Sequence, residues 1–350
     1  MTKSLMYRSF LWMGLCPAIL LAVIVFGLNN ATAFGQVRAT VPSPPSERRD
    51  RFGIYNWGVD YTSYPAGSAV DRLNWGADKV AEIGSRTIRV AMPGDIYAAG
   101  GMNDDLAQAA ASPAYDKLFS DPRFATIMLT VKSSTEVASG WADGYMQEEY
   151  NAVRDEIARL GDYLLTNPKY AGKTFIIFNW EGDNAMTGYE NKQTIWDAYT
   201  AWIQSRADGV KLARGRNPAS AVKLYIGLEF NLVRDLKTGK PCGTPVADPI
   251  REDPLENRCV IDYVAPRVDV DYYSLSSWWT LDVKFQGLDA SYKDALKADL
   301  SFALAKVREG RPEITEANFI IGEYGMHRTR WGETIIANFT NEFFDAVTAP

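Results

Sequence analysis

FIIFNWEGDN, residues 175–184, is the stretch that decides the fold prediction. Its first half is a run of β-branched and aromatic residues, which is typical of a strand buried on both faces of a sheet. Its second half presents the carboxylates of Glu181 and Asp183 directly after that strand. A buried strand that ends on acidic residues predicts either a capped turn or a functional site.

Six further stretches share this apolar composition and alternate with helical patterns. The strand-like stretches are residues 52–57, 87–92, 124–131, 223–230, 268–278 and 319–325. The helical patterns are residues 69–84, 146–165, 193–215, 292–309 and 333–347. Strands that alternate with helices predict parallel pairing through right-handed crossovers. Because no GxGxxG loop follows an early strand, a doubly wound sheet is disfavoured, and we predict an α/β fold of the (β/α)8 TIM-barrel type.

The predicted barrel spans residues 52–350, but only seven strand-like stretches can be recognised in it. If the chain is a truncated product, the barrel is predicted to be incomplete at its C-terminus. The alternative is that an eighth strand is present without a clear sequence pattern. An open barrel leaves unpaired backbone on its first and seventh strands, which favours aggregation or a partner.

The N-terminal residues 1–33 are predicted to lie outside the barrel. They contain two basic residues, a long apolar run and a small-x-small cleavage pattern at Ala31 and Ala33, which together predict a signal peptide and export. The apolar run is longer than a signal core of about 7–15 residues, so a membrane anchor is the alternative. Residues 34–51 are rich in Pro, Ser and Arg and are predicted to be a disordered linker. The expected location is secreted or in the cell envelope.

The composition limits the classes of ligand. The chain has 350 residues, a net charge of −6, and 10 Trp, 18 Tyr and 15 Phe. No basic stripe is present to neutralise phosphates, so nucleic acid is not an expected partner. Abundant aromatic rings on an acidic protein suit a neutral ligand that can stack, such as a sugar, although any single ring is more often part of the core.

Two cysteines lie in one polar, Pro-rich stretch. In an exported protein, Cys242 and Cys259 predict a disulfide, and two free thiols are the alternative. A metal site is less favoured because the chain has a single His. We therefore predict neither a metal nor a cofactor.

Carboxylates end two strands that should face each other. Glu181 follows the fourth strand-like stretch and Glu323 ends the seventh, and barrels place their chemistry at these C-terminal ends. Cleavage of a glycosidic bond needs two such acids, one protonated toward the leaving oxygen and one charged toward the anomeric carbon. A separation of roughly 5–5.5 Å between them would mean a covalent intermediate and retained configuration.

On the motifs NWEGD and GEYG, the sequence resembles the retaining (β/α)8 glycoside hydrolases of the cellulase, β-mannanase and β-xylosidase type, known as clan A. The resemblance runs from about Phe52 to the end of the chain. It implies that Glu181 is the acid/base and Glu323 is the nucleophile. In the family, an Asn directly precedes the acid/base, whereas here Trp180 separates Asn179 from Glu181.

Other polar and aromatic residues at the strand ends are candidates for substrate binding, each with a structural alternative. Arg89 can lower the pKa of the nucleophile or form a salt bridge inside the barrel. Glu229 is a rival acid or a buried partner of Arg89. Asp183 is a sugar ligand or a helix cap, Asn179 fits the family motif, and Trp278 can stack on a sugar or belong to the core. The same strand end also carries a serine, Ser276.

Two functions remain open from the sequence. The first is an exported or membrane-tethered glycoside hydrolase that cleaves a β-linked polysaccharide or oligosaccharide by double displacement. The alternative is a non-catalytic carbohydrate-binding or cell-envelope barrel derived from a glycosidase. A metal-dependent hydrolase is a distant third. The sugar, the linkage and exo or endo action depend on loop shapes.

Overall fold

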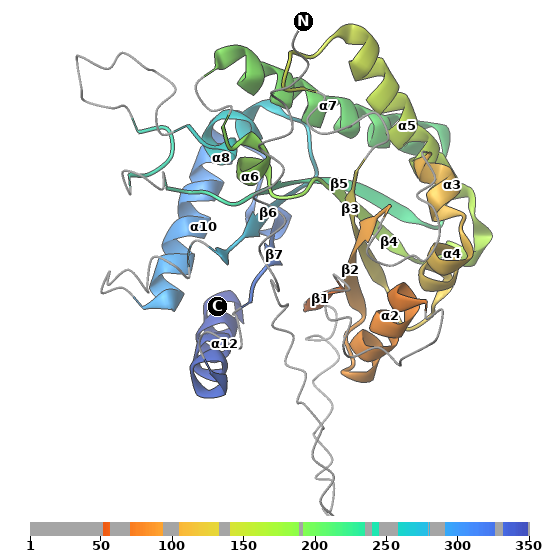
Figure 1. Cartoon of the computed structure of the whole chain (residues 1–350), viewed down its shortest axis with the longest axis horizontal. Coiled ribbons are helices and arrows are strands. Elements are labelled where there is room, and N and C mark those ends of the chain that lie inside the picture. The colour runs from red at the N-terminus through yellow and green to blue at the C-terminus, as the bar shows by residue number, and fades with distance from the viewer. Residues whose placement is uncertain are drawn as a thin grey trace, which may run out of the picture.

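The fold is an α/β barrel built on one parallel sheet. The computed structural model describes residues 52–56, 71–93, 105–132, 141–188, 192–234, 240–244, 258–278, 280, 291–325 and 332–348. Within them, seven strands follow each other around the sheet in chain order, from β1 to β7, and every neighbouring pair is parallel. The sheet curls into a nearly closed barrel with the helices outside it (Figure 1). The predicted fold class is confirmed.

Each predicted strand has a counterpart in the structure. The strands are β1 (Gly53–Asn56), β2 (Thr87–Met92), β3 (Thr126–Val131), β4 (Thr174–Phe178), β5 (Lys223–Phe230), β6 (Tyr272–Ser276) and β7 (Phe319–Glu323). The prediction of a strand over residues 268–278 was too long, because residues 268–271 form an irregular bend before β6 and a turn at residue 277 ends it. A 3-10 turn (Ala265–Arg267) precedes the bend. An irregularity between Leu275 and Ser276 shifts the register, so that Ser276 lies opposite Glu323 on β7.

The helices form the outer layer. They are α2 (Arg72–Glu82), α3 (Leu106–Ala110), α4 (Pro113–Ser120), α5 (Gln147–Thr166), α6 (Gly182–Met186), α7 (Gln193–Arg216), α8 (Val260–Tyr263), α10 (Tyr292–Arg308) and α12 (Glu333–Thr348). The short helices α3, α4, α6 and α8 were not predicted. The long helices α5 and α7 can approach closely because Gly209 has no side chain; a Cβ there would lie 2.6 Å from the carbonyl oxygen of Arg154.

The strands present apolar side chains to the helices and carry polar side chains on their inward face. In β2, Arg89 lies between Ile88 and Val90, and alternation along a strand sends it to the opposite face. All three are buried, with Arg89 only 3% exposed. The prediction of near-continuously apolar strands therefore needs a correction, because the inward face of the barrel holds a buried polar layer.

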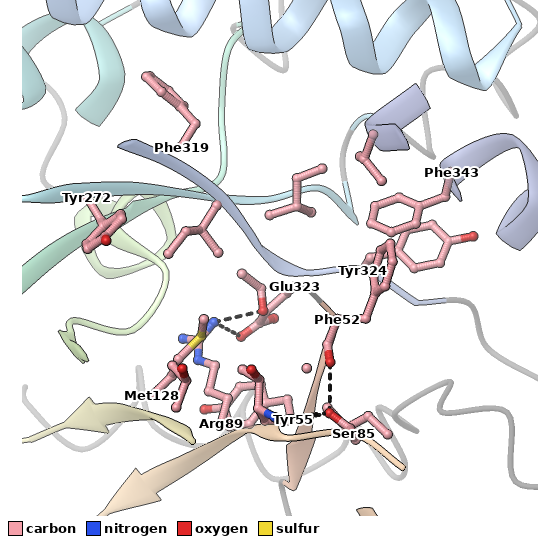
Figure 2. Close-up of a pocket in the computed structure, with 18 of the residues that line it drawn as sticks. Phe52, Tyr55, Ser85, Arg89, Met128, Tyr272, Phe319, Glu323, Tyr324 and Phe343 are labelled. Carbon is pink, nitrogen blue, oxygen red and sulfur yellow. Dashed lines mark hydrogen bonds and ion pairs between the residues drawn. The ribbon is translucent and has the colours of Figure 1, made fainter. Parts of the chain in front are cut away.

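Among the described residues, the barrel is not closed between its first and last strands. In the described part of the chain, β1 pairs only with β2, and β7 pairs only with β6. A cavity of about 1550 Å³ is lined by inward residues of the strands and by α12, with Phe52, Tyr324 and Phe343 on its apolar side and Arg89 and Glu323 at its polar end (Figure 2). The predicted open edges on the first and seventh strands are thus present among the described residues.

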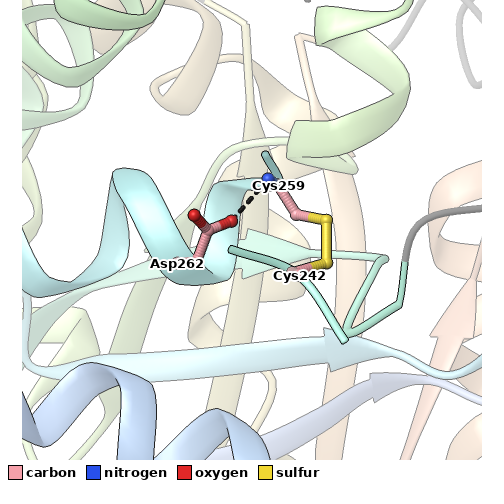
Figure 3. Close-up of side chains that lie close together, drawn as sticks. All are labelled: Cys242, Cys259 and Asp262. Atoms are coloured by element: carbon pink, nitrogen blue, oxygen red, sulfur yellow. Dashed lines mark hydrogen bonds between the residues drawn. A yellow bond between two sulfur atoms is a disulfide. The ribbon is translucent and has the colours of Figure 1, made fainter. Parts of the chain in front are cut away.

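The predicted disulfide is also present. Cys242, in the chain after β5, is bonded to Cys259 at the start of α8, with their Cα atoms 5.6 Å apart (Figure 3). The backbone N–H of Cys259 donates to Asp262 at 2.5 Å. The cross-link therefore fixes the first turn of α8 against the end of β5.

Replacing both cysteines with serine is expected to lower the free energy of unfolding by about 3 kcal/mol, because the bond closes a loop with a sequence separation of 17 residues. The measurement is urea denaturation of the oxidised protein and of the Cys242→Ser/Cys259→Ser variant. A reducing agent should destabilise the parent and leave the variant unaffected. Equal midpoints for parent and variant would refute a stabilising role.

The predicted segments before the barrel are not tested by the structure. The signal peptide or membrane anchor at residues 1–33 and the linker at residues 34–51 lie outside the described residues. Among the helices that are described, none is long and apolar enough to cross a membrane.

Candidate active site

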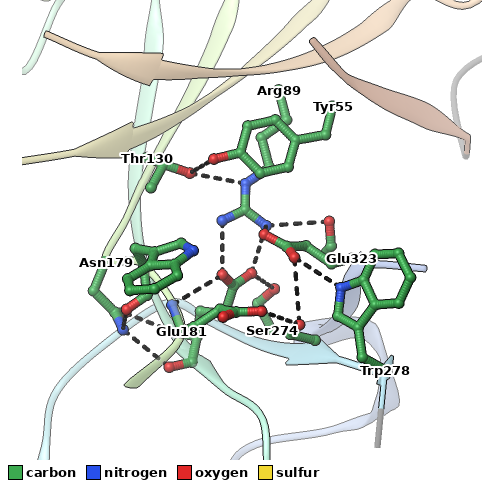
Figure 4. Close-up of polar contacts among 12 residues, drawn as sticks. Tyr55, Arg89, Thr130, Asn179, Glu181, Ser274, Trp278 and Glu323 are labelled. Carbon is green, nitrogen blue, oxygen red and sulfur yellow. Dashed lines mark hydrogen bonds and ion pairs between the residues drawn. The ribbon is translucent and has the colours of Figure 1, made fainter. Parts of the chain in front are cut away.

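Buried polar side chains from five strands meet at the C-terminal mouth of the barrel (Figure 4). In a parallel barrel, the ends of all strands lie on the same rim, so residues far apart in sequence come together there. The side chains that form this cluster are Arg89 from β2, Glu181 after β4, Glu229 from β5, Ser276 from β6 and Glu323 from β7.

Arg89 and Glu229 form an ion pair in the centre of the cluster. Nη1 of Arg89 lies 2.5 Å from Oε2 of Glu229, and Nη2 lies 2.7 Å from Oε1. The guanidinium also donates to Thr130 and to the carbonyl oxygen of Gly322, and it lies over the ring of Tyr55 at 4.4 Å. Arg89 and Glu229 therefore form the salt bridge inside the barrel that the sequence analysis gave as the alternative. Their contact with a substrate stays a prediction.

Glu181 is held in an unusual backbone conformation. Its φ of 24° places it near the left-handed region, which residues other than glycine seldom adopt and which is often found at functional sites. Its backbone N–H donates to Oε1 of Glu229 at 3.3 Å. Its carboxylate accepts from the hydroxyl of Ser276 at 3.0 Å and from the amide of Asn184. These contacts aim the carboxyl of Glu181 into the mouth of the barrel.

Glu323 lies beside Glu181. Its Oε2 accepts from the indole N–H of Trp278 at 3.0 Å and lies 3.5 Å from the hydroxyl of Ser276. Its Oε1 is 3.6 Å from the guanidinium of Arg89. The hydroxyl of Ser276 therefore lies within reach of both Glu181 and Glu323. The structure thus brings the two acids that the sequence predicts as a pair to the same hydroxyl group.

The burial of the two acids has consequences for their protonation. Burial raises the pKa of Glu323 to about 8, and the carboxylates of Glu229 and Glu181 act in the same direction. Burial and Glu229 also raise the pKa of Glu181, while hydrogen bonds from Ser276 and Asn184 lower it. Because burial disfavours charge on both acids and three carboxyls surround one guanidinium, a proton on the Glu181 and Glu323 pair is favoured.

Asn179 is turned away from the two acids. Its amide donates to the carbonyl oxygen of Glu229 at 2.9 Å and accepts from the backbone N–H of Glu229 at 2.8 Å. It also donates to the hydroxyl of Tyr199 at 3.3 Å. The side chain therefore fastens β4 to β5, and its predicted role in substrate binding stays untested.

Asp183 is likewise bound to backbone. It is buried and accepts from the N–H groups of Asn231 at 2.8 Å, Leu232 at 3.0 Å and Val260 at 2.8 Å. It thereby joins the turn after β4 to the end of β5 and to the first turn of α8. The structure gives Asp183 a structural role, whereas its proposed contact with a sugar hydroxyl has no support among these contacts.

Trp278 follows β6 and is half-buried. Its indole N–H bonds to Glu323, and its side chain lines the cavity. It therefore lies where a ligand next to Glu323 would contact it, and stacking on a sugar remains a prediction.

Sequence reasoning missed four residues that surround the cluster. Ser274 donates to Oε2 of Glu229 at 3.0 Å, and Thr130 links Arg89 to the hydroxyl of Tyr55. Asn184 binds the carboxylate of Glu181. The signal was weak but present for Ser274, because it lies two residues before Ser276 on β6 and so shares its face.

A comparison with known protein families and with curated proteins found no family model and no curated protein that matches this chain. One group of potential metal ligands occurs among the described residues, namely Cys242, Cys259 and Asp262. Both sulfurs are in the disulfide, so they cannot act as thiolate ligands.

The shifted pKa of Glu323 predicts a pH dependence of stability. The folded carboxyl keeps its proton up to about pH 8, whereas the unfolded one loses it near its ordinary pKa of 4.5. The native state therefore binds more protons in this interval, and the free energy of unfolding should fall as the pH rises through it, by up to about 1.4 kcal/mol per pH unit.

Urea denaturation between about pH 5 and about pH 8 measures this slope. Glu323→Gln should flatten it, because an amide does not titrate. A smaller slope should remain from Asp262, whose pKa burial raises to about 6. An unchanged slope in the variant would contradict the protonation of Glu323.

Proposed function

We propose that this protein hydrolyses β-glycosidic bonds of a polysaccharide or oligosaccharide by a retaining, double-displacement mechanism. The observation that carries the proposal is the contact of the Glu181 and Glu323 carboxyls with the single hydroxyl of Ser276, at 3.0 and 3.5 Å. Retaining glycosidases hold their two carboxyls roughly 5–5.5 Å apart, whereas inverting ones leave about 6.5–9.5 Å for a water molecule. Two carboxylate oxygens that both approach one hydroxyl this closely are too near each other for most of the inverting range, which favours the first class.

The charges around the pair support different roles for the two acids. Glu323 faces the cation of Arg89 and the indole N–H of Trp278, and both stabilise its anion. Glu323 is therefore the nucleophile of the proposal, as the resemblance to clan A implies. Glu181 lies farther from that cation and suits the acid/base.

The reaction then has two steps. Glu323 attacks the anomeric carbon while Glu181 gives its proton to the leaving oxygen, and a glycosyl ester forms. Water, deprotonated by Glu181, then cleaves this ester and releases the sugar and the free carboxylate of Glu323. The first step requires the proton of the acid pair to be on Glu181, so a proton held by Glu323 must first move to Glu181 when substrate binds. The hydroxyl of Ser276, which contacts both acids, lies on the path of this transfer.

The test is the configuration of the first product. Proton NMR during hydrolysis of an aryl β-glycoside should show the β-anomer first and the α-anomer only later, through mutarotation. The α-anomer as first product would exclude double displacement.

A non-catalytic carbohydrate-binding or cell-envelope barrel is the second candidate. It is favoured by the hydrogen bonds that the carboxylates of Glu181 and Glu323 already accept from Ser276 and Trp278. It is also favoured by the open side between β1 and β7 in the described part of the barrel. Calorimetric binding of oligosaccharides without any product over days would support this alternative. For either function we propose a secreted or cell-envelope location, on the basis of residues 1–33.

A further inference from the structure

Glu229 is the one carboxylate of the cluster that has no role in the proposed reaction. It is fully buried, at 0% exposure, so it cannot approach a substrate in this structure. Its two oxygens accept from Arg89, from the hydroxyl of Ser274 at 3.0 Å and from the backbone N–H of Glu181 at 3.3 Å. A buried charge with this many partners is held in one position.

The partner that matters most is Arg89, because it lies between two acids. Its Nη1 is 2.5 Å from Glu229 but 3.6 Å from Glu323. Because Glu229 is the nearer acid, it neutralises most of the positive charge of Arg89 that would otherwise stabilise the anion of Glu323. Without Glu229, the guanidinium would be the counter-ion of Glu323 alone, and the proton of the acid pair would be lost at lower pH.

The second partner is the backbone of Glu181, the residue with the φ of 24°. Its N–H points at Oε1 of Glu229, and the main chain of Glu229 is in turn fixed by two hydrogen bonds to Asn179. A strained turn persists only where surrounding contacts define it. Glu229 supplies one such contact directly beneath the acid/base of the proposal.

We propose that Glu229 is a positioning residue, which keeps one proton on the Glu181 and Glu323 pair by forming an ion pair with Arg89, and which holds the turn of Glu181. This inference rests on the proposed function for its kinetic consequences. Within the described strands, the titratable groups that face Glu323 are the hydroxyl of Tyr55 on β1, the guanidinium on β2 and the carboxyls after β4 and on β5.

The test uses changes of opposite charge at the two ends of the ion pair. Glu229→Gln leaves Arg89 without this counter-ion, so the high-pH limb of the kcat/KM profile should shift to lower pH by about one pH unit or more. Arg89→Gln leaves the carboxylate of Glu229 without its cation, so the same limb should shift to higher pH. The double variant removes both charges, and its limb should return to within about half a unit of the parent. A merely structural role would not give opposite shifts that cancel.

Two further variants sharpen the result. Glu229→Asp keeps the charge, so the limb should stay near that of the parent. Ser274→Ala removes an uncharged contact of Glu229, and it should also leave the limb in place. Shifts in the same direction for Glu229→Gln and Arg89→Gln, or a shift in Glu229→Asp as large as in Glu229→Gln, would overturn the proposal.

A second readout separates this inference from the proposed function. Carbon-13 NMR of labelled glutamate carboxyls follows the shared proton directly and needs no turnover. Opposite shifts in this titration without any hydrolysis would support the role of Glu229 and refute the hydrolase. If the single variants do not fold, the double variant Glu229→Gln/Arg89→Gln tests the proposal. It should fold, because two neutral side chains are tolerated in a buried position where one unpaired charge is not. Failure of the double variant to fold would overturn the proposal.

Discussion

Replacement of Glu323 with Gln should lower kcat/KM for an aryl β-glycoside by about 10⁴-fold, which is the largest effect we expect from a single change. The amide has nearly the size of the carboxyl but cannot form a covalent ester with the sugar. Stability should not fall with activity. The buried carboxyl has a raised pKa, so an uncharged group at this position should match or exceed the stability of the parent above about pH 7.

The matching change at Glu181 should depend on the substrate. Glu181→Gln removes the proton donor, so glycosides with a poor leaving group should lose about 10² to 10⁴ in kcat/KM, while an activated dinitrophenyl glycoside should lose much less in its first step. Steady-state and pre-steady-state release of the phenol measures both effects. Glu148→Gln, at an exposed position of α5, is the control and should behave as the parent. Full activity in Glu323→Gln would contradict the assignment.

The second large effect concerns stability. Asp183→Ala should lower the free energy of unfolding by about 3 kcal/mol or more, because it leaves two buried backbone N–H groups and one part-buried one without their acceptor. The groups belong to residues 231, 232 and 260, so the end of β5 and the start of α8 should loosen together. Urea denaturation at neutral pH measures the loss.

Two comparisons make this prediction specific. Asp183→Asn keeps one acceptor oxygen and should lose less stability than Asp183→Ala. Asp155→Ala changes a carboxylate that is 49% exposed on α5, and it should stay within about 0.5 kcal/mol of the parent. A rise in KM with unchanged stability in Asp183→Asn would instead make Asp183 a ligand of the sugar.

The fold could be predicted because its strands are compositionally distinct. β4 and β5 are runs of large apolar residues separated by α7, whose buried Ile195, Tyr199 and Trp202 recur at helical spacing. Short helices such as α3 (Leu106–Ala110) have no such period, since a segment of one or two turns cannot show one. The polar layer inside the barrel could not be predicted from the sequence, for a different reason. A single Arg89 in an apolar run does not reveal which face of the strand it occupies.

The candidate site was predicted in part for a related reason. The strand ends predicted that Glu181 and Glu323 face each other at the barrel mouth, and the structure places both beside Ser276, because every strand of a parallel barrel ends on the same rim. They could not show that Glu229 occupies the centre, since its depth follows from the register between strands. Nor could they show that Asp183 is bound by Val260, a residue 77 positions away. Long-range backbone partners of this kind leave no local pattern.

The open side of the described barrel has a mechanical consequence. A fully closed barrel has a circumference fixed by its number of strands and their stagger, so its bore cannot change without breaking hydrogen bonds. Here β1 and β7 each have one free edge among the described strands, and the gap between them continues into the cavity below Glu323. The circumference of the described sheet is therefore not fixed by a closed ring of backbone hydrogen bonds, and on this side the end of β1 is held by side-chain packing on α12, where the rings of Phe52 and Phe344 lie 4.7 Å apart.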